Sequence, residues 1–163
     1  MTSIPGHQFM LILSMKDAKF LVKKHPKKLN VISVTRESKT SPEIKKNAKN
    51  HLQVDIDDIS FDTASPEEQN PTSGYKFAVA EDILKVINFA KTHKVHIIHC
   101  GYGQSRSPAI AYAVYRSQGY TKDAAMDKVM DMLLKRLGPV EFCDVSPNSW
   151  IIQLTDQIFD KKK

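Results

Sequence analysis

The chain has no run of apolar residues approaching the ~20 that a membrane-spanning helix needs. It also lacks an N-terminal stretch in which a charged start precedes a long apolar segment and a small-residue cleavage site, so we expect no secretory signal. Internal repeats are absent. With 163 residues, 41% hydrophobic and 26% charged, the composition favours one globular domain over residues 1–163, without a membrane partner.

Cysteine is scarce, since Cys100 and Cys143 are the only two. They could pair, but a nucleophilic role for either one requires a free thiol and a reducing compartment, and the cytoplasm is the simplest expectation. The six histidines show no recurrent spacing with cysteines or carboxylates. The sequence therefore predicts no zinc site and no cofactor.

Acidic residues are outnumbered, with 18 Asp and Glu against 24 Lys and Arg, for a net charge of +6. This balance favours anionic substrates or partners. Lysines gather around His25-Pro26 and in the tail 161–163. A solvated turn and a frayed tail are the simpler interpretation, and a patch for acidic protein segments or nucleic acid is the alternative.

Apolar runs and helical spacings alternate along the chain. They predict strands at 9–14, 29–34, 51–56 and 95–98, and helices at 16–24, 43–48, 77–93, 107–118, 121–137 and from Trp150 onward. Residues 57–74, rich in Asp, Ser, Pro and Glu, read as a long loop, a type that is more often functional than idle. The alternation predicts an α/β three-layer sandwich, in which a largely parallel sheet of four or five strands lies between helices.

The most informative segment is 99–107, His-Cys-Gly-Tyr-Gly-Gln-Ser-Arg-Ser, between the predicted strand at 95–98 and an Ala-rich helix. The N–H groups at a helix N-terminus bind anions, and a thiol placed there beside a guanidinium should be ionised near neutral pH. Five residues between Cys100 and Arg106 let the loop curl, so that its N–H groups and the arginine fork face one tetrahedral dianion. The pattern predicts a site that cleaves phosphate esters, with Cys100 as the nucleophile.

This segment resembles the signature His-Cys-x-x-Gly-x-x-Arg-Ser/Thr of the Cys-dependent protein tyrosine phosphatase superfamily. The likeness is strongest to its compact dual-specificity branch and to small microbial phosphatases, and it extends from about Leu52 to Phe159. The matching residues are His99, Cys100, Gly103, Arg106 and Ser107. Tyr102 departs from the alanine that is common at its position. The resemblance implies a protein tyrosine phosphatase-like fold and hydrolysis through a phosphocysteine intermediate.

The resemblance and the chemistry assign roles to the loop. The phosphate cradle is expected to consist of Gly101, Tyr102, Gly103, Gln104, Ser105 and Arg106. Gly103 suits a turn with positive φ, and Gly101 permits close approach of an anion. His99 should orient the loop by hydrogen bonds to the backbone. Ser107 should donate to the thiolate as it leaves, and can also cap the following helix.

The departing alkoxide or phenoxide needs a proton, so an acid is expected on another loop. The candidates are Asp55, Asp57, Asp58 and Asp62. In the family that the chain resembles, the acid follows an alternating strand at the position that Asp58 holds here. Asp55 is expected on the polar face of the strand, Asp57 is the near alternative and Asp62 the distant one. Asp58 should first donate a proton, then accept one from the hydrolytic water.

The leading function is a monomeric protein phosphatase acting on phosphotyrosine, with phosphoserine and phosphothreonine as further candidates. Because the chain is basic and related proteins use the same loop, an RNA 5′-phosphatase is the second interpretation, and nucleic acid is the less favoured partner. A phosphoprotein-binding module without turnover is the third. The loop interior 101–105 carries no Lys or Arg, which counts against a pocket for polyanionic inositol lipids.

Overall fold

The computed structural model describes residues 10–60, 63–142 and 144–161. Four parallel strands form one sheet in the order β1-β4-β2-β3, which confirms the predicted α/β class. The strands are β1 (Leu11–Leu13), β2 (Asn30–Val34), β3 (Asn50–Val54) and β4 (Ile97–His99). The acid candidate Asp62, Cys143, Phe9 of the first predicted strand, and Lys162 and Lys163 of the tail lie outside the described residues.

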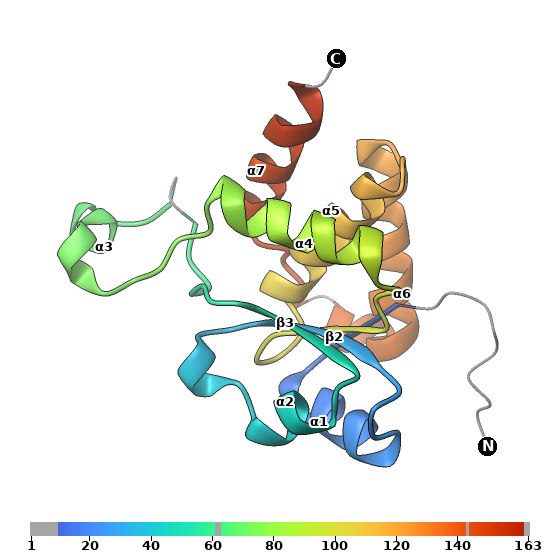
Figure 1. Ribbon diagram of the computed structural model, residues 1–163. Helices are drawn as coiled ribbons and strands as arrows, with labels where there is room; N and C mark the ends of the chain where they lie inside the picture. Colours follow the sequence, from blue (N-terminus) through green and yellow to red (C-terminus); the bar gives the residue numbers. More distant parts are fainter. Residues whose placement is uncertain (1–9, 61–62, 143, 162–163) are drawn as a thin grey trace.

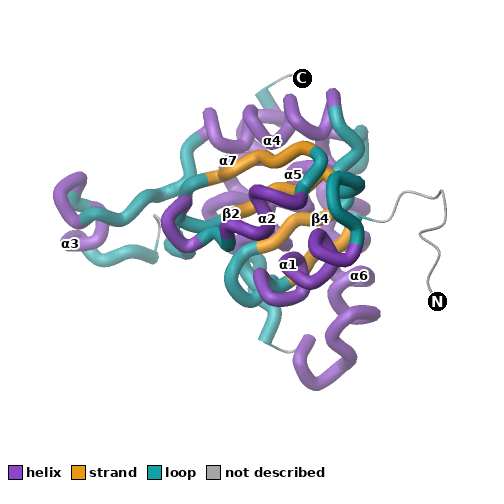
Figure 2. The backbone as a smooth tube through the Cα atoms, turned by 60° about the horizontal axis from the view of Figure 1, so that its bottom comes forward, coloured by secondary structure: helices purple, strands orange, loops and turns teal. Residues whose placement is uncertain are grey.

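Helices cover both faces of the sheet (Figure 1). On one face lie α1 (Met15–Lys24) and α2 (Pro42–Asn47), which stand in front of the strands in Figure 2. The other face carries α4 (Ala80–Thr92), α5 (Arg106–Ser117), α6 (Lys122–Phe142) and α7 (Ser149–Asp160). The arrangement is the three-layer sandwich that the alternating pattern predicts.

Helix α5 lies at the centre of the larger core. Its residues from Ser107 to Val114 are all buried, and it contacts α4, α6 and α7 as well as β1, β2 and β4. A smaller apolar cluster fills the space between the sheet and α1–α2, around Val22, Val31 and Ile44. Because the strands are parallel, their carboxyl ends meet at one edge, where β4 runs into α5.

Several boundaries differ from the sequence-based expectations. The strand predicted at 51–56 ends at Val54, so Asp55 follows it. The loop 57–74 contains two short helices, α3 (Pro66–Gln69) and η2 (Pro71–Ser73), and α3 projects from the body of the molecule (Figure 1). A reciprocal capping box between Ser65 and Glu68 stabilises α3. A further short helix, η1 (Glu37–Lys39), lies in the predicted loop 35–42.

The helix predicted to end at Gly138 is interrupted there by a positive φ of 75°, but helical residues follow up to Phe142. In the part of the chain that the structure describes, no helix combines the length and apolar character needed to cross a membrane.

Candidate active site

Cys100 lies directly after β4, at the floor of the loop, with 3% of its surface exposed. Its Sγ accepts a hydrogen bond from the main-chain N–H of Gly103 at 3.2 Å and lies 3.2 Å from Oγ of the fully buried Ser107. Both groups can donate to a thiolate, and hydrogen bonds to the charged form favour that form. The sulfur therefore lies where the loop stabilises negative charge.

The loop is held by its carbonyl groups. Five of the six carbonyls in residues 100–105 accept hydrogen bonds from side chains or from other segments. Since a peptide N–H points opposite to the preceding carbonyl, this outward tethering turns the N–H groups toward the loop interior. The pairs are His99 Nδ1 with Cys100 O (3.0 Å), Met15 N with Gly101 O (3.0 Å), Arg136 Nη2 with Gly103 O (3.1 Å), Ser146 N with Gln104 O (3.0 Å) and Asn148 N with Ser105 O (3.1 Å).

Gly103 is required by its place in this loop. Its φ is +76°, and a Cβ there would lie 2.7 Å from the main-chain carbon of Leu13. The carboxyl end of β1 thus packs against the loop, and no side chain fits between them. At Gly101 a Cβ would meet only Nη2 of Arg106, at 3.9 Å, an ordinary contact.

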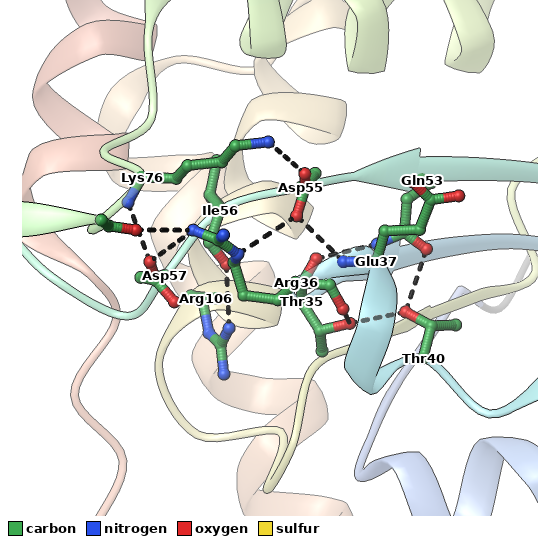
Figure 3. Close-up of polar contacts among 11 residues, drawn as sticks. Thr35, Arg36, Glu37, Thr40, Gln53, Asp55, Ile56, Asp57, Lys76 and Arg106 are labelled. Atoms are coloured by element: carbon green, nitrogen blue, oxygen red, sulfur yellow. Dashed lines mark hydrogen bonds and ion pairs between the residues drawn. The ribbon is translucent and has the colours of Figure 1, made fainter.

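Arg106 begins α5 and reaches across to the segment that follows β3. Its Nη1 donates to the main-chain carbonyl of Ile56 at 3.1 Å (Figure 3). Its Nε is buried and has no hydrogen-bond partner among the described residues. A buried unsatisfied donor costs about 1–3 kcal/mol, and more when it belongs to a charged group, so this N–H is suited to an anionic oxygen. The guanidinium is held in place through Nη1, while Nε remains able to donate to an anionic ligand.

Of the three acidic candidates that the structure describes, Asp58 is the one whose side chain reaches the cradle. Its Oδ1 accepts hydrogen bonds from Ser105 Oγ at 2.7 Å and from Asn148 Nδ2 at 3.1 Å. A pocket of about 320 Å³ brings its side chain together with those of Cys100 and Arg106. The lining residues are Asp58, Cys100, Tyr102, Gln104, Ser105, Arg106, Asp144 and Ser146.

Asp57 belongs to a different hydrogen-bond network, at the start of the loop 57–74 (Figure 3). Its Oδ2 accepts hydrogen bonds from Arg36 Nη1 at 3.1 Å and from the main-chain N–H of Lys76 at 2.8 Å. It is absent from the residues that line the pocket. These contacts give Asp57 a part in holding the loop.

Asp55 belongs to the same network. Its carboxylate pairs with the ammonium of Lys76 and accepts a hydrogen bond from the main-chain N–H of Glu37 at 2.9 Å. Partial burial opposes ionisation, but these hydrogen bonds outweigh it and hold the pKa of Asp55 below its usual value. Asp55 does not line the pocket that contains Cys100 and Arg106. The cause is its binding to Lys76 and Glu37, and not a position within β3, which ends one residue earlier.

His99 is fully buried between β2 and the loop. Its Nδ1 lies 3.0 Å from the carbonyl of Cys100, and its Nε2 lies 2.6 Å from Oγ of Ser33. Burial lowers the pKa of His99, although the contact with the Cys100 carbonyl opposes the shift. The imidazole is therefore neutral near pH 7 and serves as a hydrogen-bonding brace for the loop.

The rim of the pocket carries Tyr102, whose side chain is 84% exposed. A second hollow of about 440 Å³ adjoins the first and shares Asp58, Ser105 and Ser146 with it.

Among the described residues, no group of three or more His, Cys, Asp and Glu side chains could hold a metal ion.

Sequence reasoning missed three groups that build the site: the side chains of Asn148 and Arg136 and the carbonyl of Ile56. Asn148 precedes a predicted helix, which is a capping signal, and its Oδ1 does cap α7 through Ile151 N at 3.1 Å. No local signal points to its contact with Asp58. Arg136 acts from the middle of α6, far from the loop in sequence.

No protein-family model and no curated protein matches the chain by sequence. Solved structures match it in fold. The PTP-2 phosphatase of Cydia pomonella superposes with a TM-score of 0.59 at 18% identity, covering 93% of this chain and 86% of that one. The Yvh1 phosphatase domain of Chaetomium thermophilum gives 0.58 at 17% identity, covering 98% and 95%.

A third similar structure is the human tyrosine phosphatase-like serine/threonine/tyrosine-interacting protein, with a TM-score of 0.56 at 18% identity over 91% of this chain and 87% of that one. These likenesses cover 91–98% of this chain. The chain has the fold of the Cys-dependent protein tyrosine and dual-specificity phosphatases.

Proposed function

We propose that the protein is a phosphatase that hydrolyses phosphotyrosine in proteins, with phosphoserine and phosphothreonine as further substrates, through a phosphocysteine intermediate. The observation that carries the proposal is the pocket shared by Cys100, Arg106 and Asp58. It unites a nucleophile, an anion-binding guanidinium with a free buried N–H, and a carboxyl group at the rim.

In the first step the Cys100 thiolate attacks phosphorus, so that an S–P bond forms while the P–O bond to the leaving group breaks. Arg106 and the inward N–H groups of the loop bind the three outer oxygens, which carry charge throughout the transfer. Asp58, as the carboxylic acid, gives its proton to the departing oxygen. The products are the free alcohol or phenol and phosphocysteine.

In the second step water attacks phosphorus, and the Asp58 carboxylate takes its proton. The S–P bond breaks, releasing phosphate and restoring the thiolate. Ser107 Oγ, 3.2 Å from Sγ, donates a hydrogen bond to the sulfur as its charge returns. A cycle through free Cys100 requires a reducing compartment, so we place the protein in the cytoplasm.

The charges around the pocket support a protein substrate over RNA. Among the described residues that line it, Arg106 is the only cationic one, and Asp58 and Asp144 bring two carboxylates. A triphosphorylated RNA end would meet repulsion there, while a single phosphate on a tyrosine side chain needs only the cradle. The net charge of +6 still favours anionic partners and keeps the RNA 5′-phosphatase as the second candidate.

The proposal is tested by comparing a phosphotyrosyl peptide with 5′-triphosphorylated RNA in one assay, using the full chain and its Cys100→Ser variant. We expect release of phosphate from the peptide by the parent. The variant should bind the peptide without turnover, because the cradle survives the change. A preference for RNA by more than about tenfold in kcat/KM, or about 1.4 kcal/mol of barrier, would reverse the assignment.

A binding module without turnover is the third candidate. It would bind the phosphopeptide equally well as parent and as Cys100→Ser, and neither form would release phosphate. Retained hydrolysis by Cys100→Ser would exclude covalent catalysis.

A further inference from the structure

A chain of three hydrogen bonds crosses the sheet and ends at the nucleophile. His51 Nε2 on β3 lies 2.8 Å from Oγ of Ser33 on β2, and the same Oγ lies 2.6 Å from Nε2 of His99 on β4. His99 Nδ1 then lies 3.0 Å from the carbonyl of Cys100. Ser33 and His99 are both fully buried and stand opposite each other in the register of β2 and β4.

The Cys100 carbonyl, at one end of this series of hydrogen bonds, sets the direction of each of them. A carbonyl oxygen only accepts, so His99 must carry its proton on Nδ1. Because His99 is neutral, its Nε2 is bare and accepts the single proton of the Ser33 hydroxyl. Ser33 Oγ can then only accept from the other side, so His51 must carry a proton on Nε2.

His51 is suited to be the outer end of this chain. Its side chain is half-buried at the edge strand, where it meets Lys45 from α2 and Glu37 from η1 besides His99. Burial is the main cause that lowers its pKa to about 4, with His99 and Lys45 adding to the shift and Glu37 opposing it. His51 is therefore neutral at physiological pH and has two tautomers, of which the chain selects the one protonated at Nε2.

We propose that His51 and Ser33 are positioning residues for the nucleophile, acting through His99 on the carbonyl of Cys100. The inference rests on the proposed function. The Cys100 carbonyl is the first of the five that are tethered outward, and its tether depends on a proton at His99 Nδ1.

The other tautomer of His99 would place a lone pair against the Cys100 carbonyl and push the two apart. With His51 present, that tautomer requires the Ser33 hydroxyl and the His51 proton to reverse together with His99, because Ser33 would otherwise receive two protons and donate none to a partner in the hydrogen-bond chain. Without His51, the Ser33 hydroxyl can reverse alone and accept from His99, so only the Cys100 carbonyl then restrains the tautomer. The loop would then lose the fixed position of residue 100 and, with it, part of the stabilisation of the thiolate.

The experiment measures alkylation of Cys100 by iodoacetamide against pH in the full chain, following the Cys100 peptide by mass spectrometry. Two variants, His51→Leu and Ser33→Ala, interrupt the series of hydrogen bonds. A third, His51→Gln, keeps it, because the side-chain amide can donate from the position of Nε2. His93→Gln, a matched change at the end of α4, is the control. Thermal melting shows that each variant is folded.

We expect His51→Leu and Ser33→Ala to move the midpoint of the alkylation profile upward by about half a unit to one unit, and so to slow alkylation at pH 6 about threefold to tenfold. His51→Gln and His93→Gln should keep the alkylation midpoint of the parent protein. In parallel, ¹⁵N–¹H spectra of histidine-labelled protein should show His99 protonated at Nδ1 in the parent and mixed tautomers in His51→Leu.

Two outcomes overturn the inference: His99 protonated at Nε2 in the parent, or an unchanged midpoint in folded His51→Leu and Ser33→Ala. Failure of the proposed function looks different. The parent itself would then alkylate with the midpoint of an ordinary cysteine, whatever the tautomer of His99.

Discussion

Asn148 donates a hydrogen bond through Nδ2 to Oδ1 of Asp58 at 3.1 Å. The carbonyl oxygen of the same amide accepts one from the main-chain N–H of Ile151 at 3.1 Å and so caps α7. The cap needs an acceptor, which fixes the orientation of the amide and directs its N–H groups to Asp58. One buried side chain thus begins a helix and holds the proposed acid over the pocket.

Replacing Asn148 by Asp separates these two roles. The new carboxylate can still cap α7, where negative charge is favourable, but it puts a second anion beside Asp58. Like charges favour the protonated form of Asp58, so the descending limb of the pH–rate profile should move to higher pH, by about one unit. The measurement is kcat/KM for an aryl phosphate between pH 5 and 9.

Asn148→Ala is the matched comparison. It removes the cap without adding a charge beside Asp58, and it should lower the free energy of unfolding by about 1 kcal/mol. If the descending limb of Asn148→Asp coincides with that of the parent, Asn148 has no influence on the acid and serves as a helix cap alone.

In the proposed mechanism, replacing Asp58 by Asn removes the proton that the leaving group needs. We expect kcat to fall about 10²-fold or more for phenyl phosphate, and much less for a substrate whose leaving group is a weak base. Asp57→Asn is the control, since Asp57 lines no part of the pocket and holds Arg36 and Lys76 N. It should lower the melting temperature, with the same small change of rate for both substrates. Sensitivity to the leaving group in Asp57→Asn, and none in Asp58→Asn, would move the acid to Asp57.

The two glycines of the cradle should respond differently to alanine. Gly103→Ala places a Cβ 2.7 Å from the backbone of Leu13 at a positive φ, so the loop must shift and activity should fall below detection. Gly101→Ala meets only the Arg106 side chain at 3.9 Å and should fold as the parent does. Kinetics and thermal melting of the two variants check this. Comparable activity in both would mean that the loop adapts at Leu13.

The cradle could be predicted from sequence because it is local. Residues 99–107 are contiguous, and a strand before them and a helix after them place the thiol and the guanidinium at one helix N-terminus. The same locality explains why the parallel α/β class followed from the alternation of short apolar runs with helical spacings. Helix α3 escaped prediction although its cap, Ser65 with Glu68, is local, because no apolar residue in its four positions gives a helical spacing.

What holds the cradle in place could not be predicted, because those contacts join distant segments. Asn148 reaches Asp58 across 90 positions, and Arg136 reaches Gly103 across 33. Neither residue type is unusual where it stands in the sequence. The choice among the aspartates is of the same kind: what distinguishes Asp58 from Asp57 is which partners the fold brings to each carboxylate.

The histidine at the edge of the sheet makes stability depend on pH. The pKa of His51 falls from its ordinary 6.5 to about 4 in the folded protein, chiefly through burial. Between these values the unfolded chain binds the proton and the folded chain does not, so the free energy of unfolding decreases as pH falls from 6.5 to 4. Above pH 6.5 this contribution is constant. His96 and His99, whose pKa values burial also lowers, act in the same direction.

We therefore expect His51→Gln to lessen the pH dependence of unfolding between pH 6.5 and 4 by up to about one proton per molecule, because a glutamine has no proton to gain. Urea denaturation at intervals of half a pH unit measures the slope for parent and variant. His93→Gln, which replaces a histidine outside the hydrogen-bond chain, is the comparison variant. Equal slopes in all three proteins would mean that His51 is protonated in the folded state as readily as in the unfolded chain, and it would then be a cation facing Ser33 at neutral-to-acid pH.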